Sequence, residues 1–254
     1  MHPGLQNVAN RAAYYATLRQ TLLAETLEEQ VGDHQIAGDL QEGTLQFVGA
    51  ERTLTARCHL IASVAPGDAP AGTATDATRA GVLLPAPANT HSHAFQRAIA
   101  GLTERRGAGS DSFWTWRELM YRFVGTITPD QAQAIAAFVQ MEMLEAGYGT
   151  NVEFHYLHHQ PDGTPHADIA EMSARIAAAA GQSGIGLTLL PVMYQYGGCD
   201  RRPLAGGQLR FGNDLDRFGR LVDGARRALS ALPDARLGVG PHSLRAVAAQ
   251  DFAA

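Results

Sequence analysis

The sequence has no lysine, and all 20 of its basic residues are arginine. This absence excludes chemistry that needs a lysine amine: a Schiff base, the lysine of a phosphate-binding loop, or a carbamylated lysine bridging two metal ions. The patterns G-x-S-x-G, G-x-G-x-x-G and C-x-x-C are absent too. The chain therefore offers no nucleophile elbow, no dinucleotide fingerprint and no redox pair.

Cysteine, net charge and long apolar runs are also scarce. With only Cys58 and Cys199, we expect no disulfide framework and a reducing, cytoplasmic setting. No apolar run approaches the ~18 residues needed to span a membrane, and the start lacks a signal-peptide pattern. The net charge of −5 gives no reason to expect nucleic acid as a partner.

At 254 residues the chain can form one large domain or two small ones. An amphipathic pattern from about Arg11 to Gln30 predicts a helix, to which we assign no chemistry. Residues 44–64 are rich in β-forming residues and predict two short strands, and the composition of residues 65–81 predicts a loop or linker. We expect three parts: a helical extension over 1–43, a small β segment with its linker over 44–81, and the main domain over 82–254.

From residue 82 onward, predicted strands alternate with predicted helices. The best-marked helix has Thr128 as its N-cap, Pro129 at its first position, Gln131 completing a capping box and Gly147 just past its end. Further helices are predicted at 166–184 and 213–232, and strands at 82–93, 150–156, 185–195 and 236–243. Such alternation is typical of a parallel sheet. The predicted fold is therefore α/β: a partial (β/α)₈ barrel of about four units, preceded by a small β segment.

Polar, reactive residues stand at the end of each predicted strand. They are His91 and His93, then His155 and Tyr156, then Tyr194 and Gln195, then His242 and Ser243. In parallel α/β folds the functional site lies at the C-terminal ends of the strands. The four strand ends are therefore expected to line one pocket.

The pair His91 and His93 is the main candidate for a metal site. Residues two apart on a strand point the same way, and two neutral imidazoles suit Zn²⁺ or a similar metal. The alternative is a pair of surface histidines at a turn. His155 is expected to face the pocket, whereas His158 and His159 are expected to be solvated loop histidines.

Two arginines stand out as possible anion-binding residues because of their positions. Arg245 follows the fourth strand, and Arg117 lies in FWTWRELMYRF, which is interpreted as a long loop able to fold over a pocket. A guanidinium group can hold a carboxylate by two hydrogen bonds. The other arginines are expected to be solvated surface charges. Tyr156 either donates a hydrogen bond to a substrate or packs over the barrel rim.

Five stretches between residues 82 and 247 resemble the formimidoylglutamate deiminases, enzymes of bacterial histidine degradation in the amidohydrolase superfamily. They are NTHSHAFQRAIAGL, DSFWTWRELMYRF, EFHYLHH, GIGLTLLPVMYQ and GVGPHSLRAV. Residues 44–81 resemble the family's N-terminal β segment more loosely, and residues 1–43 do not resemble its usual start.

The resemblance implies a hydrolase with one zinc ion in a (β/α)₈ barrel, which converts N-formimino-L-glutamate to N-formyl-L-glutamate and ammonia. Matched residue by residue, His91 and His93 resemble the first two zinc ligands. The positions that resemble substrate-binding residues are Gln96, Arg117, Tyr156, His242 and Arg245. The residues agree with this, because a dicarboxylate substrate suits arginines and the lack of a bridging lysine favours one metal ion.

The resemblance also implies groups that the sequence does not contain. In the family, a His and an Asp from the fifth and eighth strands complete the zinc site, and the acid–base Glu and His come from the fifth and sixth. This sequence ends at Ala254, just after the fourth predicted strand, so the acid–base residues are expected beyond Ala254 and no catalytic residue is assigned within the chain. His242 does not replace the third ligand, because its motif matches a substrate-binding position. We therefore expect a partial form of the enzyme, with negligible deiminase activity unless a second polypeptide supplies strands five to eight.

Other functions remain open on the sequence alone. Another mononuclear amidohydrolase, such as an aminopurine or cytosine deaminase, would share the metal site, although a neutral nucleobase needs no pair of arginines. A non-catalytic protein that retains the carboxylate pocket would bind glutamate derivatives without metal or turnover. Assembly into a homo-oligomer through the helix predicted in residues 1–43 is a third interpretation, which rests on that helix alone.

Overall fold

The computed structural model describes residues 35–37, 44–48, 52–57, 60–66, 86–102 and 113–253. The helix predicted from Arg11 to Gln30 lies outside the described residues. So does the predicted linker from residue 67 onward.

A four-stranded antiparallel sheet precedes the main domain. Its strands follow one another in sequence order: β1 (Gln35–Ala37), β2 (Thr44–Val48), β3 (Arg52–Arg57) and β4 (Leu60–Pro66). The prediction of two strands in this segment is wrong, because the run of β-forming residues is divided twice rather than once. β1 also pairs with β2 from a position before residue 44, so the sheet extends beyond the predicted β segment.

The main domain is built on a parallel sheet. Its strands are β5 (Ala88–Ser92), β6 (Thr150–His155), β7 (Gly186–Met193), β8 (Arg236–Leu237) and β9 (Gly240–Pro241). They run in the order β5-β6-β7-β8, and β9 also pairs with β7. The predicted α/β partial barrel is therefore confirmed, although its fourth strand consists of two short pieces on either side of Gly238.

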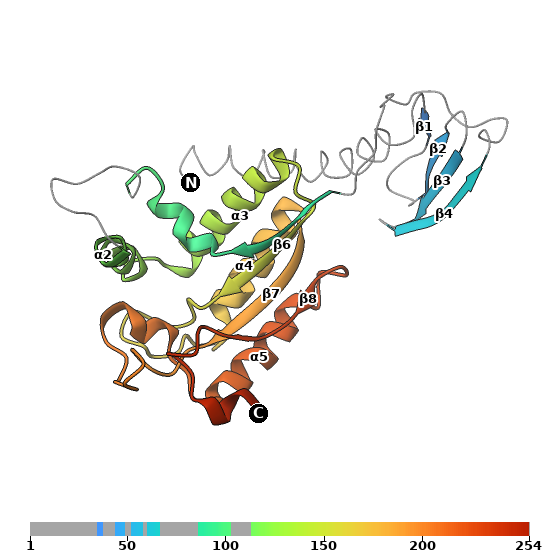
Figure 1. The fold of residues 1–254 in the computed structure, drawn as a ribbon. Helices are drawn as coiled ribbons and strands as arrows, with labels where there is room; N and C mark the ends of the chain where they lie inside the picture. Colours follow the sequence, from blue (N-terminus) through green and yellow to red (C-terminus); the bar gives the residue numbers. More distant parts are fainter. Residues whose placement is uncertain are drawn as a thin grey trace.

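Three α-helices cover one side of the curved sheet (Figure 1): α3 (Pro129–Glu145), α4 (Glu171–Ser183) and α5 (Leu215–Leu229). The other helices are α2 (Phe113–Val124) and three 3-10 helices: η1 (Ala94–Ile99), η2 (Gly206–Phe211) and η3 (Ala249–Ala253). The segment FWTWRELMYRF, interpreted as a loop, lies within α2. Its aromatic residues give weak helix propensity, so packing against η1 and η2 rather than local preference favours the helix.

Capping residues set the ends of α3 as the sequence predicts. The Thr128 side chain accepts a hydrogen bond from the Gln131 backbone N–H, and the Gln131 side chain accepts one from the Thr128 N–H. Gly147, just past the helix, has φ of +88°, a conformation that glycine adopts without the steric cost of a Cβ.

Residues of β6 alternate between the two faces of the sheet. Asn151, Glu153 and His155 are buried, and Val152 and Phe154 are only half-buried. The buried set faces the helices, where a core cluster is formed by apolar residues of β7, α3, α4 and α5. The half-buried set faces the inside of the barrel, which is the side where a barrel holds its ligands.

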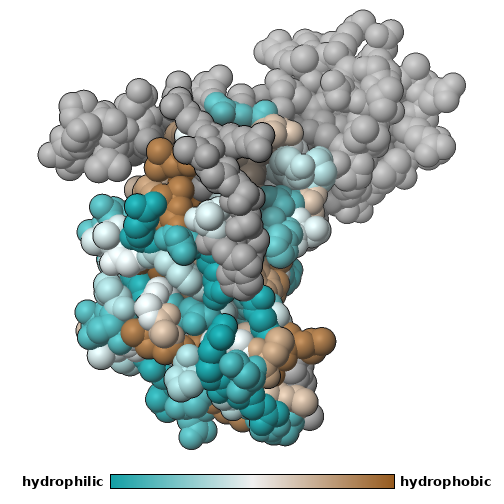
Figure 2. All heavy atoms as spheres, turned by 60° about the vertical axis from the view of Figure 1, so that its left-hand side comes forward, coloured by the Kyte–Doolittle hydropathy of each residue, from teal (hydrophilic) through white to brown (hydrophobic). Residues whose placement is uncertain are grey.

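No helix among the described residues is long and apolar enough to cross a membrane. Figure 2 shows one face of the molecule, on which the described surface is mostly hydrophilic. Hydrophobic residues on this face gather in separate places and form no continuous band.

Candidate functional site

The two histidines of the H-x-H pattern lie on the same side of the sheet, at the end of β5. The ring centroids of His91 and His93 are 4.6 Å apart, with an angle of 81° between the planes. Both rings also contact the ring of Phe154 on β6, with centroids 5.7 and 5.3 Å away. This common side is what strand alternation predicts for residues two apart.

A hydrogen bond fixes the orientation of the His93 ring. Its Nδ1 lies 3.1 Å from the backbone oxygen of Phe154, and because a carbonyl can only accept, Nδ1 carries the proton. Burial lowers the pKa of His93, partly opposed by this bond, and nearby His91 lowers it further. The ring is therefore neutral near pH 7 and can offer Nε2 as a metal ligand.

The pair fits a zinc ion as two of its ligands. Imidazole nitrogen is a preferred zinc ligand, and a second hydrogen bond from the other ring nitrogen is typical of such sites. Among the described residues, no group of three or more His, Cys, Asp or Glu side chains is placed to hold a metal ion. The structure thus brings together the two predicted ligands and, in its described part, no third one.

Glu153 links the strand behind the site to the residue that follows His93. Its Oε1 accepts a 2.7 Å hydrogen bond from the Ala94 backbone N–H. Burial raises the pKa of this carboxyl to about 7, although bonds from Ala94, Ser92 and Asn151 lower it. No sequence signal distinguishes this glutamate, since it faces the helices and not the barrel.

The acid–base residues of the predicted reaction are expected beyond Ala254, and the structure describes the chain only as far as Ala253. Ala254 itself lies outside the described residues, so this expectation stays a prediction. Glu153 does not take the place of the expected acid–base glutamate. It is 1% exposed, and its carboxylate is turned to the Ala94 N–H rather than to the inside of the barrel.

Tyr156 and Gln96 meet beside the histidine pair. The Gln96 side chain donates a 3.0 Å hydrogen bond from Nε2 to the hydroxyl oxygen of Tyr156. The ring of Tyr156 lies 5.3 Å from that of His93 and 5.4 Å from that of His242, between centroids. Burial raises the pKa of the Tyr156 hydroxyl, which is therefore protonated at neutral pH.

His242 lies among the charged residues predicted to bind substrate. Its ring centroid is 4.5 Å from that of Tyr194, at the end of β7. Its pKa is lowered to about 4 by burial first, and then by the nearby side chains of Arg245, His93 and Arg117. Residues predicted at the ends of all four strands therefore come together here, namely His93, Tyr156, Tyr194 and His242.

Arg117 projects from α2 and is held by a residue of the same helix. Its Nε donates a 2.7 Å hydrogen bond to the Tyr121 hydroxyl, and its Cζ lies 5.0 Å from the centroid of the Tyr121 ring. Both Arg117 and Arg245 lower the pKa of Tyr121, although burial raises it overall. Tyr121 was not among the predicted site residues, and no sequence motif marks it.

The remaining histidines do not belong to this site. The prediction that His155 faces the pocket is wrong, because it alternates with Phe154 and points to the helices, where burial lowers its pKa to about 3. The prediction that His158 and His159 are solvated is also wrong, since both are 0% exposed. His158 Nε2 lies 3.1 Å from the Val192 oxygen.

One arginine departs from the expectation that arginines other than Arg117 and Arg245 are solvated. Arg210 is 1% exposed and donates hydrogen bonds to the backbone oxygens of His159, Val124 and Ile127. Burial lowers its pKa to about 10. It joins the end of α2 to the loop after β6, and no local sequence signal distinguishes it from a surface arginine.

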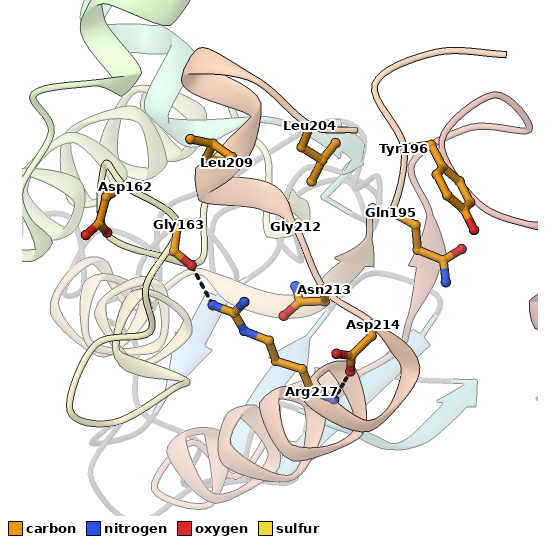
Figure 3. Close-up of a pocket in the computed structure, with 10 residues that line it drawn as sticks. All are labelled: Asp162, Gly163, Gln195, Tyr196, Leu204, Leu209, Gly212, Asn213, Asp214 and Arg217. Carbon is orange, nitrogen blue, oxygen red and sulfur yellow. Dashed lines mark hydrogen bonds between the residues drawn. The ribbon is translucent and has the colours of Figure 1, made fainter. Parts of the chain in front are cut away.

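A cavity of about 410 Å³ opens between the loops after β6 and β7 and the start of α5 (Figure 3). Arg217 crosses it, with one guanidinium nitrogen donating a 2.7 Å bond to the Gly163 oxygen. Asn213 lines it too, and its Oδ1 is 2.9 Å from His159 Nε2. None of the residues predicted to bind zinc or substrate lines this cavity.

The sequence profile of the amidohydrolase family matches residues 82–231, more than half of the chain. The chain belongs to the amidohydrolase family. A second profile, described as a family of unknown function, matches residues 6–70. That match includes the four-stranded sheet and ends before the amidohydrolase match begins.

The resemblance to formimidoylglutamate deiminases is also confirmed. This amidohydrolase chain is 51% identical over 173 residues to the formimidoylglutamate deiminase of Pseudomonas aeruginosa, covering 68% of this chain and 38% of the relative. It is 46% identical to an amidohydrolase crystal structure from Brucella melitensis, with a TM-score of 0.71, covering 83% of this chain and 44% of that one.

A more distant structure supports the fold alone. Atrazine chlorohydrolase TrzN from Arthrobacter aurescens, solved with zinc, is 17% identical with a TM-score of 0.59, covering 88% of this chain and 48% of that one. The chain thus spans less than half the length of each of these three relatives.

Proposed function

We propose that this amidohydrolase chain forms part of a zinc-dependent deiminase that hydrolyses N-formimino-L-glutamate to N-formyl-L-glutamate and ammonia in histidine degradation. The supporting observation is that the ring of Tyr156 lies beside those of both His93 and His242, with centroids 5.3 and 5.4 Å away, and that Arg245 and Arg117 act electrostatically on His242. A paired-imidazole centre beside two guanidinium groups suits a substrate with one reacting group and two carboxylates. The 51% identity to a protein named for this activity supports the same substrate.

His91 and His93 would hold the zinc ion, together with ligands from outside the described residues. Zinc bound there would supply Lewis-acid chemistry and make a water molecule nucleophilic near pH 7. The chain's own part is to hold His93 in one tautomer through the Phe154 oxygen. The bond from Ala94 to buried Glu153 keeps the segment after His93 in place.

Arg117 and Arg245 would each bind a carboxylate of the substrate. Tyr156 accepts its hydrogen bond from Gln96, so its own O–H can be donated to a substrate oxygen. His242 has a pKa of about 4 and is neutral at pH 7. It can therefore hydrogen-bond to the substrate without adding a third positive charge that would repel the arginines.

The second candidate is a non-catalytic protein that binds dicarboxylates. It is favoured by one observation, the absence of a third metal ligand among the described residues. Its expected behaviour is binding of glutamate derivatives with neither zinc binding nor turnover. A deaminase of neutral nucleobases is disfavoured, because a neutral base offers no carboxylate to either guanidinium group.

A complementation experiment tests the proposal. The 254-residue chain is mixed, in zinc-containing buffer, with the part of the Pseudomonas aeruginosa deiminase that it does not match, and ammonia release from N-formimino-L-glutamate is measured. We expect release in the mixture and little from the chain alone. We also expect its loss with His93→Ala and its retention with the control Tyr196→Phe.

The alternatives give different results in the same assay. Binding of N-formyl-L-glutamate by calorimetry, with no zinc uptake and no ammonia from any mixture, would support the binding protein instead. Ammonia from cytosine or an aminopurine, and none from N-formimino-L-glutamate, would contradict the proposed substrate.

A further inference from the structure

Tyr121 contacts Arg117 in two ways. Its hydroxyl accepts a 2.7 Å hydrogen bond from Arg117 Nε, and its ring centroid lies 5.0 Å from the guanidinium carbon. The two residues are four apart on α2, the spacing that places side chains side by side on a helix. A bond at Nε together with a contact across the guanidinium plane restricts both the direction and the tilt of that group.

Tyr121 is itself held in place by η2. A Cβ at Gly207 would lie only 2.7 Å from Tyr121 Cδ1, so the absence of a side chain at Gly207 allows this close approach. The ring of Phe211, also on η2, has its centroid 6.3 Å from that of Tyr121. Arg210 on the same element donates a hydrogen bond to the carbonyl oxygen of Val124, so η2 contacts α2 both at Tyr121 and at its last residue.

The chemistry of a phenol suits this place beside Arg117, where Arg245 also acts electrostatically on Tyr121. A carboxylate here would also orient Arg117, but it would neutralise the charge that a substrate carboxylate needs. A neutral hydroxyl orients the cation without adding a negative charge. Tyr121 thus supplies an acceptor for Nε that does not compete with an anionic ligand.

We propose that Tyr121 is a positioning residue, which orients the Arg117 guanidinium group for an incoming carboxylate while η2 holds the tyrosine in place. This inference rests on the proposed function, in that Arg117 must bind a carboxylate of the ligand. Tyr121 acts through Arg117 and is not itself a catalytic residue.

Calorimetric titration of the full chain with N-formyl-L-glutamate tests this role. Tyr121→Phe removes one hydroxyl and should weaken binding about 3- to 10-fold, the usual range for a lost hydrogen bond in a folded protein. In an Arg117→Met background the same change should have no further effect, because there is no guanidinium left to orient. The matched control is Tyr196→Phe, whose ring lies 5.9 Å from the guanidinium carbon of Arg201.

Each outcome separates this inference from the proposed function. If Arg117→Met weakens binding and Tyr121→Phe does not, the positioning role of Tyr121 is wrong, but Arg117 still binds a carboxylate of the ligand. Equal losses from Tyr121→Phe in both backgrounds would show a general structural role and also overturn the inference. If the wild-type chain binds no probe, or Arg117→Met binds as well as wild type, the proposed function fails and the inference fails with it.

Discussion

The main domain holds two sets of histidines in different surroundings. His93 and His242 are half-buried beside the charges of Arg117 and Arg245. His158 and His159 are fully buried, and the Nε2 atom of each ring bonds to a neighbouring protein oxygen. Burial lowers the pKa in both sets, so a shifted pKa does not by itself identify a functional histidine here.

A single step along β6 separates the two environments. The ring of Phe154 contacts His91, His93 and His242, and the next residue, His155, contacts His158. Strand alternation turns neighbouring side chains to opposite faces, which explains the change. We therefore expect the side chains on the inner face to serve the chemistry and the buried histidines to contribute to stability.

The largest expected effect is on stability, in the buried set. His158→Ala should lower the free energy of unfolding by about 2–4 kcal/mol, because it leaves a cavity and removes the hydrogen bond to the Val192 oxygen. Urea denaturation followed by circular dichroism measures it. The matched variant from the other set, His242→Ala, should cost about 1 kcal/mol or less, since that ring is half-buried. Equal losses would remove the distinction between the sets.

For zinc affinity we expect the reverse of the stability result, with a large effect in the first set and none in the buried set. His93→Ala should weaken zinc affinity at least about 10- to 100-fold, because it removes one of two protein ligands. His159→Gln, which keeps a polar side chain in the buried set, should leave the affinity unchanged. Competition against a colorimetric chelator gives both values. Weaker zinc binding in His159→Gln would mean that the buried histidines, rather than the H-x-H pair, hold the metal.

Acid should destabilise the protein through the histidines whose pKa burial lowers, which include the buried set and His242. The pKa of His155 falls from the ordinary value of 6.5 to about 3, and that of His159 to about 4. The unfolded chain takes up these protons first, so the stability is present above pH 6.5 and is lost progressively as the pH falls toward those values. The loss is up to about 1.4 kcal/mol per pH unit for each fully buried histidine.

Glu153 changes the stability with pH in the opposite direction to the histidines. The histidine contribution is therefore measured as a difference between a variant and the wild-type chain. Its pKa is raised to about 7, so it favours folding below pH 4.5 and loses that contribution as the pH rises through 7. His159→Gln should therefore flatten the dependence of unfolding free energy on pH between 6.5 and 4.5 relative to wild type. Parallel curves for the two proteins would show that His159 is not buried in its neutral form.

Much of this arrangement is predictable from local sequence signals. The capping residues of α3 and the apolar strands determine where elements begin and end, because those signals act within a few residues. The convergence of His93, Tyr156 and His242 follows from the parallel sheet, which places strand ends at one edge. The choice of Arg117 and Arg245 as possible anion-binding residues rested only on their positions in the sequence and on the family resemblance.

The features that the sequence does not predict depend on distant contacts. The backbone N–H groups of His158 and His159 both bond to the Arg210 oxygen, so a segment about fifty residues later buries these histidines. α2 likewise depends on η2, which contacts it at Tyr121 and, through Arg210, at Val124. The sequence around a residue carries no signal for a contact with a residue of a distant loop.

The smallest expected effect on stability, that of His91→Ala, distinguishes most clearly between a chemical and a structural histidine. His91→Ala should change the free energy of unfolding by no more than about 0.5 kcal/mol, because the side chain is exposed and its ring is not part of the buried core. The same variant should lose zinc binding as fully as His93→Ala. A residue that is neutral for folding and essential for the metal has a chemical role, whereas a large loss of stability in His91→Ala would make the H-x-H pair structural, like the buried histidines.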